Sequence, residues 1–219
     1  MSAFRALLLD FGGVCLFSPV ELHHLTERHL GLPAGTFSWR GPFDVSTDAL
    51  YRAMLAGELT EREYWHQRAR DVGQAAGREL SLRDYFEICY DGTEDEILRP
   101  GTVALAEKAR AVGLKTGILT NDLEAFHGPE FKGKFTGFFG AMATYVDASI
   151  TGVLKPDPRS YQAALEGLGL PAEEVLFVDD QPRNIEGAEA LGMPTVFFDL
   201  ADVEGSLARA EAALLGKDA

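Results

Sequence analysis

The feature that most constrains this fold is a series of short apolar runs that alternate with helical patterns. The run at residues 4–10 (FRALLLD) closes on Asp10, just before two glycines. Three more runs share this character, residues 114–120 (LKTGILT), 175–180 (VLFVDD) and 194–199 (PTVFFD), and a fifth at 138–145 (FFGAMATY) is weaker. Runs that are apolar at every position are typical of strands buried on both faces, so they predict a parallel sheet covered by helices.

The helical patterns between these runs are bounded by proline and glycine. Residues 100–112 and 158–168 each begin with proline and end just before a glycine, and residues 184–191 end at Gly192. Proline suits the first turn of a helix and glycine its end. Strands that alternate with helices predict an α/β fold with a doubly wound, mostly parallel sheet. Ligands of such sheets bind at the carboxyl ends of the strands.

The stretch from about Pro19 to Arg99 breaks the alternation. It shows helical patterns at residues 20–31, 47–57, 60–73 and 82–92, and no convincing strand. Thr60 followed by Glu63 predicts a capping box at the start of the third pattern. We therefore expect a catalytic core of residues 1–17 and 95–219 and an inserted all-helical cap of residues 18–94. The cap is expected to close over the strand ends, exclude water and select the substrate.

Composition narrows the class of partner. The chain has 219 residues, 46% of them hydrophobic, and a formal net charge of -14. That charge argues against binding to nucleic acid or to an anionic membrane, both of which need clustered Lys and Arg. Only Cys15 and Cys89 are present, which indicates neither a disulfide framework nor a structural zinc site. With no run of ~20 apolar residues and no signal-peptide cleavage site, we expect a cytoplasmic protein that acts on a small molecule.

Two adjacent acidic residues give the sharpest sign of a functional site. Asp179 and Asp180 close the run at residues 175–180. Neighbouring carboxylates at a buried strand end repel each other unless a cation or a lysine lies between them. No His or Cys cluster accompanies the pair, so the expected cation is a hard, oxygen-preferring ion such as Mg²⁺.

Other polar residues at the strand ends have ordinary explanations when each is taken alone. Asp10 can initiate a turn, and Lys155 in the segment LKPDP can be a solvated surface charge. Thr120 and Asn121 can cap a helix, although a hydroxyl and backbone N–H groups at a helix start can also hold an anion. Their order along the chain is what makes them one site.

In that order, the segments LLLDFGGV, LTND, LKPDP and VLFVDDQPRN resemble the four motifs of the haloacid dehalogenase (HAD) superfamily, and the early helical block matches the cap found after the first motif. The resemblance spans essentially the whole chain. It implies a HAD-like hydrolase, specifically a magnesium-dependent phosphatase that acts on small phosphorylated metabolites.

The resemblance also implies roles in phosphoryl transfer. Asp10 would be the nucleophile that attacks phosphorus and forms an aspartyl-phosphate, which water then hydrolyses. Thr120 and Asn121 would bind the phosphoryl oxygens. Lys155 would bind the phosphate as well and neutralise charge on Asp10, because a carboxylate cannot approach a phosphate dianion without cationic compensation.

The implied metal site combines residues of the first and the last of the four motifs. Asp10, the main-chain carbonyl of Gly12 and Asp180 would hold Mg²⁺ together with the phosphate. Asp179 and Asn184 would surround these ligands and hold them in place without binding the ion directly.

Gly12 departs from the family pattern. Phosphatases of this family usually carry a second Asp there, which protonates the leaving oxygen and then activates water; a positioned acid or base contributes about 10² to 10⁴ in rate. Three explanations are open, and we favour the first: a substrate with a good leaving group, such as an anomeric sugar phosphate or an acyl phosphate. The second is a substitute acid from the cap, and the third is loss of hydrolysis, which would leave a phosphate- or partner-binding domain. Candidates for the substitute acid are His23, His24, Asp44 and Asp48.

Two further classes compete with a phosphatase. The metal-independent 2-haloacid dehalogenases of the same superfamily also lack that Asp, but they lack the adjacent acidic pair as well, so Asp179 and Asp180 favour phosphate chemistry. A response-regulator receiver domain needs only ~120 residues and no helical insertion. Cys15 lies near the site in sequence, yet its apolar neighbours are typical of a small packing residue.

Overall fold

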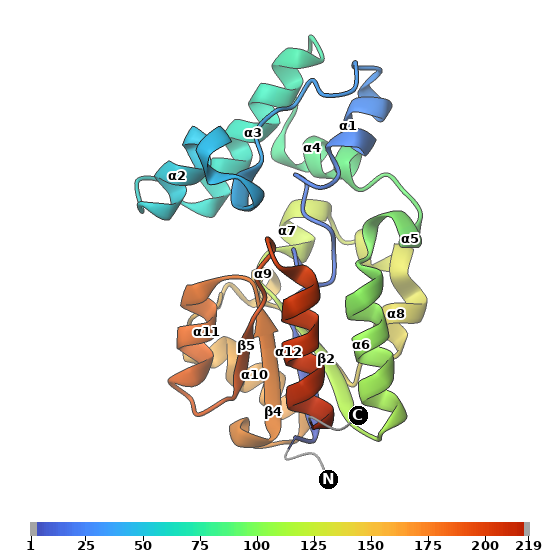
Figure 1. Cartoon of the computed structure of the whole chain (residues 1–219), viewed down its shortest axis with the longest axis vertical. Helices are drawn as coiled ribbons and strands as arrows, with labels where there is room; N and C mark the ends of the chain where they lie inside the picture. The colour runs from blue at the N-terminus through green and yellow to red at the C-terminus, as the bar shows by residue number, and fades with distance from the viewer. Residues whose placement is uncertain (1–3, 217–219) are drawn as a thin grey trace. The chain divides into compact units, whose positions relative to one another are not determined.

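The computed structural model describes residues 4–216, in which the strands form a parallel sheet in the order β3-β2-β1-β4-β5 (Figure 1). The strands are β1 Ala6–Leu9, β2 Lys115–Thr120, β3 Thr144–Asp147, β4 Val175–Asp179 and β5 Thr195–Phe197. All of β1 is buried, as is all of β4, which explains why these runs are apolar at successive positions. The predicted α/β fold with a doubly wound parallel sheet is confirmed.

Helices cover both faces of the sheet. α10 (Pro158–Leu168) packs against β2 and β3, and α11 (Pro182–Glu189) against β4 and β5. On the other face lie α6 (Pro100–Ala111) and α12 (Val203–Leu215), which also contact each other (Figure 1). Shorter elements follow β2, namely α7 Leu123–His127, the 3-10 turn η3 Phe131–Phe135 and α8 Thr136–Gly140. The helix α9 Ala148–Thr151 follows β3, and the 3-10 turn η4 Ala172–Glu174 precedes β4.

An apolar layer between the sheet and α10 and α11 fixes the strands. Tyr161 on α10 is fully buried, and its ring meets the edge of Phe177 on β4 at 5.7 Å between centroids. The remaining buried members are Ala6, Leu8, Leu119, Ala164, Leu168, Leu170, Val175, Ile185, Ala188 and Met193. Burying a side chain of Leu or Phe size stabilises a fold by about 1.5 to 3 kcal/mol, so this layer holds the strand ends firmly.

The weak strand expected at residues 138–145 is wrong in its placement. Its first part belongs to α8, and β3 begins only at Thr144. Phe138 and Phe139 pack from the helix against the ring of Phe11, with centroids 6.2 Å and 5.0 Å away. The apolar character of the run therefore comes from an aromatic cluster built on a helix, and a short apolar run does not distinguish these two structures.

The chain divides into two compact units. Unit 1 contains the sheet and is formed by the described residues up to Leu16 and from Leu98 onward, and unit 2 is Phe17–Ile97. All of unit 2 is described, and it is helical with no strand: α1 His23–Leu30, η1 Gly41–Phe43, η2 Val45–Thr47, α2 Ala49–Leu55, α3 Glu61–Ala75, α4 Leu82–Cys89 and α5 Glu94–Ile97. The role of this unit as a substrate-selecting cap stays a prediction.

The interior of unit 2 contains a buried ion pair between Asp48 and Arg68. Asp48 is fully buried and accepts hydrogen bonds from the Tyr64 hydroxyl at 2.8 Å and from Arg68. The guanidinium of Arg68 also lies 4.5 Å from the ring centroid of Trp39. The capping box predicted at Thr60 is present, with the Glu63 N–H donating to the Thr60 hydroxyl and the Glu63 carboxylate accepting from the Thr60 N–H. Among the described helices, none combines the length and the apolar character that a membrane span needs.

Candidate active site

The strand order brings the carboxyl ends of β1, β2 and β4 together. β1 lies between β2 and β4. From β1 the chain continues to β2 and β3 on one side and then crosses to β4 and β5 on the other side, so the topological switch point of the sheet lies beside β1. Leu9 pairs with Val178, and the N–H of Asp10 donates to the Val178 carbonyl at 2.9 Å, which places Asp10 alongside Asp179. Ligands of doubly wound sheets bind at this point of the fold.

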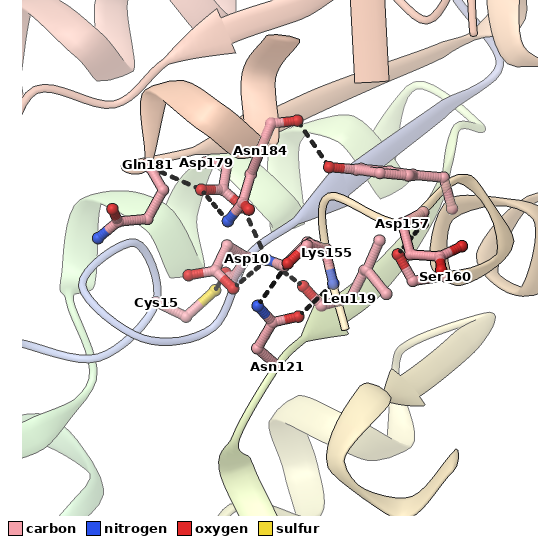
Figure 2. A network of polar contacts seen from close by, with 11 residues as sticks. Asp10, Cys15, Leu119, Asn121, Lys155, Asp157, Ser160, Asp179, Gln181 and Asn184 are labelled. Carbon is pink, nitrogen blue, oxygen red and sulfur yellow. Dashed lines mark hydrogen bonds and ion pairs between the residues drawn. The ribbon is translucent and has the colours of Figure 1, made fainter. Parts of the chain in front are cut away.

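The ammonium group of Lys155 connects these three strand ends. Its Nζ donates to Oδ1 of Asp10 at 2.6 Å, to Oδ2 of Asp179 at 2.6 Å and to the main-chain carbonyl of Leu119 at 2.9 Å (Figure 2). Lys155 is only 3% exposed. A lysine with three acceptors at hydrogen-bond distance has all of its donors used. Lys155 is therefore a built part of the site and not a surface charge.

The side chain of Asn121 holds Lys155 in place through its backbone. Asn121 follows the last residue of β2, and its Oδ1 accepts from the Lys155 N–H at 2.7 Å while its Nδ2 donates to the Lys155 carbonyl at 3.1 Å. This two-way bond fastens the loop before α10 to the end of β2. Thr120, the last residue of β2, is 5% exposed and pairs in register with Asp147 at the same edge of the sheet.

The charges of this group shift one another's pKa. Burial raises the pKa of Asp10 to about 7, with Asp179 also raising it and Lys155 opposing the shift. Burial alone would lower the pKa of Lys155, but the two carboxylates raise it above its usual range. Loss of solvation is the largest cause of the rise in the pKa of Asp10, and the second carboxylate adds to it because one ammonium group serves both. Burial also raises the pKa of the Cys15 thiol, whose Sγ donates to the Asp10 carbonyl at 3.2 Å, as expected for a packing residue.

The acidic residues fit a divalent cation. Asp10, Asp179 and Asp180 each offer a carboxylate oxygen, and these atoms lie within 4.8 Å of one another. Asp179 is held by other donors as well: the Gln181 N–H at 2.8 Å and Asn184 Nδ2 at 3.0 and 3.1 Å. Oδ1 of Asn184 is buried with no hydrogen-bond partner among the described residues, so one acceptor remains beside this cluster. Hard oxygen donors of this kind are what Mg²⁺ prefers.

The two glycines after Asp10 differ in their surroundings. Gly13 has a φ of +74°, and the Val14 N–H donates across it to the Gly12 carbonyl at 2.8 Å, which makes a three-residue turn. A Cβ on Gly13 would lie 2.6 Å from Oδ2 of Asp180. Gly12 lies outside the left-handed region, and nothing lies within 4 Å of the position its Cβ would take. Geometry therefore requires glycine at 13 but not at 12.

The residues that the sequence singled out at the strand ends thus lie at one edge of the sheet. Hydrogen bonds join Asp10, Lys155, Asn121, Asp179 and Asn184. The contributions of the Leu119 carbonyl and the Gln181 N–H were not predicted, because main-chain groups carry no residue-type signal. Their positions could only have followed from the strand register.

The four candidates for a substitute acid all lie in unit 2. Asp48 is used internally, and Asp44 caps a 3-10 turn by accepting from the N–H and hydroxyl of Ser46 at 3.1 and 2.6 Å. The ring of His23 packs against Trp39 at 4.1 Å between centroids, while His24 is exposed. The two carboxylates have local structural roles, which weakens their candidacy.

Known proteins resemble this chain in sequence. A family model described as haloacid dehalogenase-like hydrolase matches residues 4–192. The plasmid-encoded protein CbbY of Cupriavidus necator is 36% identical over 210 residues, covering 88% of this chain and 77% of CbbY. Phosphoglycolate phosphatase of Yersinia pseudotuberculosis is 29% identical, covering 89% of this chain and 80% of that enzyme. Acyl-CoA dehydrogenase family member 10 of Mus musculus is 27% identical over 90% of this chain, but this chain spans only 18% of its length.

Solved structures share the fold. A magnesium-bound crystal structure of the HAD-hydrolase YfnB from Bacillus subtilis superposes with a TM-score of 0.64 at 20% identity, covering 89% of this chain and 86% of YfnB. At that identity the likeness concerns the fold alone.

Proposed function

The chain belongs to the haloacid dehalogenase-like hydrolase family, and from that premise we propose that it is a magnesium-dependent hydrolase of small phosphorylated metabolites that works through an aspartyl-phosphate on Asp10. One observation carries the proposal: Nζ of Lys155 lies 2.6 Å from a carboxylate oxygen of Asp10 and 2.6 Å from one of Asp179. Together with Asp180, these two carboxylates can share a cation. The relative named a phosphoglycolate phosphatase supports phosphate chemistry.

In the proposed reaction, a carboxylate oxygen of Asp10 attacks the phosphorus atom, and the bond from phosphorus to the leaving oxygen breaks. Water then attacks the phosphorus of the aspartyl-phosphate, releasing phosphate and restoring Asp10. Lys155 neutralises part of the charge as the carboxylate and phosphate meet, and Thr120 lies at the strand end where its hydroxyl would bind a phosphoryl oxygen. Asn121 would act mainly by holding Lys155, because both ends of its amide bind the Lys155 backbone.

The cation site would be formed by Asp10, the Gly12 carbonyl and Asp180, with Asp179 and Asn184 supporting it. Bound Mg²⁺ would supply charge neutralisation for the phosphate and the nucleophile. Asp179 suits the supporting role, since it already accepts from Lys155, Asn184 and Gln181.

The open position at Gly12 favours a substrate whose leaving group needs little protonation. Space for a Cβ exists there, so the backbone surroundings do not require glycine at this position. We propose an anomeric sugar phosphate or an acyl phosphate as the substrate class. Gly12→Asp should raise activity on alkyl phosphates by more than it changes activity on anomeric phosphates, toward the ~10²-fold that a positioned acid contributes. Gly12→Asn is the matched control, and an equal change for both substrate types would count against the leaving-group explanation.

A phosphatase screen with and without Mg²⁺ tests the proposed function. Asp10→Asn should abolish the activity, whereas Glu174→Gln, which neutralises a carboxylate just before β4 at the other end of that strand, should retain it. Equal activity of Asp10→Asn and wild type would end the nucleophile assignment. Vanadate or aluminium fluoride binding without turnover would instead support a non-catalytic phosphate-binding domain, and metal-independent release of halide from 2-haloacids would support a dehalogenase.

A further inference from the structure

The loop that follows Asp10 is held by hydrogen bonds to its carbonyl groups. Within the loop, the N–H groups of Cys15 and Leu16 donate to the Phe11 carbonyl at 3.0 and 2.9 Å, and Val14 donates to Gly12. These bonds fix the backbone conformation of the loop between Asp10 and Leu16. The carbonyls of Gly13, Val14 and Cys15 are satisfied from elsewhere.

Their donors come from the segment at the start of α6, distant in sequence. Arg99 donates through both Nε and Nη2 to the Gly13 carbonyl, at 3.1 and 3.0 Å, and its N–H donates to the Cys15 carbonyl at 2.7 Å. The hydroxyl of Thr102 donates to the Val14 carbonyl at 2.7 Å. Arg99 is 4% exposed and Thr102 is fully buried. Three successive carbonyls of the loop are thus fixed by two residues.

The carbonyl that Arg99 holds belongs to the tightest point of the loop. Gly13 is the residue with φ of +74°, and its Cα faces the Asp180 carboxylate so closely that no Cβ would fit. The peptide between Gly13 and Val14 carries the N–H that donates to the Gly12 carbonyl, so rotation of this peptide would also move that carbonyl. It would also change the surface against which Asp180 rests. The two donors of a guanidinium fix such a peptide in direction, which one flexible ammonium cannot do.

We propose that Arg99 and Thr102 are positioning residues of the active site, which keep the Gly12 carbonyl, Asp10 and Asp180 in the arrangement that phosphoryl transfer requires. This inference rests on the proposed function. Neither residue is assigned contact with the substrate; both act through the backbone of residues 13–15. A displacement of about 1 Å in such a constellation lowers a rate by about 10²-fold, so modest loosening of the loop is measurable.

The test uses the full chain and two matched pairs. Arg99→Lys keeps the charge and loses the two-donor geometry, and Arg5→Lys, at a 65% exposed arginine before the start of β1, is its control. Thr102→Val removes the hydroxyl at nearly constant shape, and Thr102→Ser restores it. Four quantities are measured: kcat, KM, the Kd of Mg²⁺ alone by calorimetry, and the melting temperature.

We expect Arg99→Lys to lower kcat by about 10-fold or more and to weaken Mg²⁺ binding, with KM nearly unchanged. Thr102→Val should act in the same direction more weakly, and Thr102→Ser should recover the wild-type values. If Arg99→Lys does not fold, the Thr102 pair decides the question.

Unchanged kcat and Mg²⁺ affinity in the folded variants, alongside inactive Asp10→Asn, would overturn this inference and leave the proposed function standing. A lower melting temperature with unchanged kcat would likewise overturn it, since that pattern indicates a merely structural role. Wild type that neither binds Mg²⁺ nor hydrolyses any phosphate would remove the proposed function itself.

Discussion

Gly12 and Gly13 are neighbours in the sequence, but different constraints act on them. Gly13 needs its glycine because of its positive φ and the Asp180 carboxylate, whereas residue 12 has free space and ordinary backbone geometry. The Gly-Gly pattern alone indicates a turn and does not separate the two positions. Lys155 shows the same limit: its segment LKPDP identified it, but its third acceptor, the Leu119 carbonyl, follows only from the strand register.

A pair of alanine substitutions tests this difference. Gly13→Ala should lower the free energy of unfolding by about 1 to 3 kcal/mol, because a left-handed conformation is strained for alanine and the new Cβ would meet Asp180. Gly12→Ala should cost less than about 1 kcal/mol. Urea denaturation of the two variants measures the difference. Equal losses would show that the turn is not the one described.

Four of the five described strands and several helices could be predicted because each has a strong local signal. The helix at Pro158–Leu168 matches its prediction at both ends, since proline begins it and a left-handed Gly169 ends it. The four strong apolar runs became β1, β2, β4 and β5, of which β5 lies at the edge of the sheet and is only partly buried. β3 was misplaced because aromatic residues in the preceding helix give an apolar run like that of a strand. α12 was not predicted, since no proline marks its start.

The loop before α10 depends on a distant contact, because the Asn121 side chain fastens it to β2. Asn121→Ala removes both bonds to the Lys155 backbone, and leaving those groups unsatisfied costs about 1 to 3 kcal/mol. We also expect kcat to fall by about 10-fold or more, because the Lys155 ammonium loses its fixed position. Urea denaturation and steady-state kinetics check the two effects. A stable variant with wild-type kcat would show that Lys155 is held by other contacts.

At the scale of the whole molecule, the sequence predicted an α/β sheet protein with a helical insertion, and the sheet and the family are confirmed. The helical unit Phe17–Ile97 has its own interior of Asp48, Tyr64, Arg68 and Trp39. Such a polar interior could not be read from composition, because each of these residue types is also common on surfaces. The substrate-selecting role of this unit remains a prediction.

Two histidines, the partly buried His23 and the buried His127, make stability depend on pH. Burial lowers the pKa of His23 to about 4, against an ordinary value of 6.5. Between these values the unfolded chain binds a proton that the folded chain does not, so the free energy of unfolding falls as pH decreases from 6.5 to 4. We expect His23→Gln to reduce this loss by about 2 kcal/mol. His24→Gln, at an exposed neighbour, is the control.

Urea denaturation at several pH values between 4 and 7 provides the measurement. His127, whose pKa burial lowers to about 3, should supply part of the slope that remains. An unaltered slope in His23→Gln would show that this ring titrates freely in the folded chain.

The central claim is that Asp10 receives the phosphoryl group, and trapping the intermediate tests it most directly. Wild type and Asp10→Asn are mixed with acetyl phosphate, with and without Mg²⁺, quenched in acid and examined by peptide mass spectrometry. We expect a phosphoryl adduct on the peptide containing Asp10, only in wild type and only with Mg²⁺. An adduct on another residue, or turnover that persists in Asp10→Asn, would contradict it.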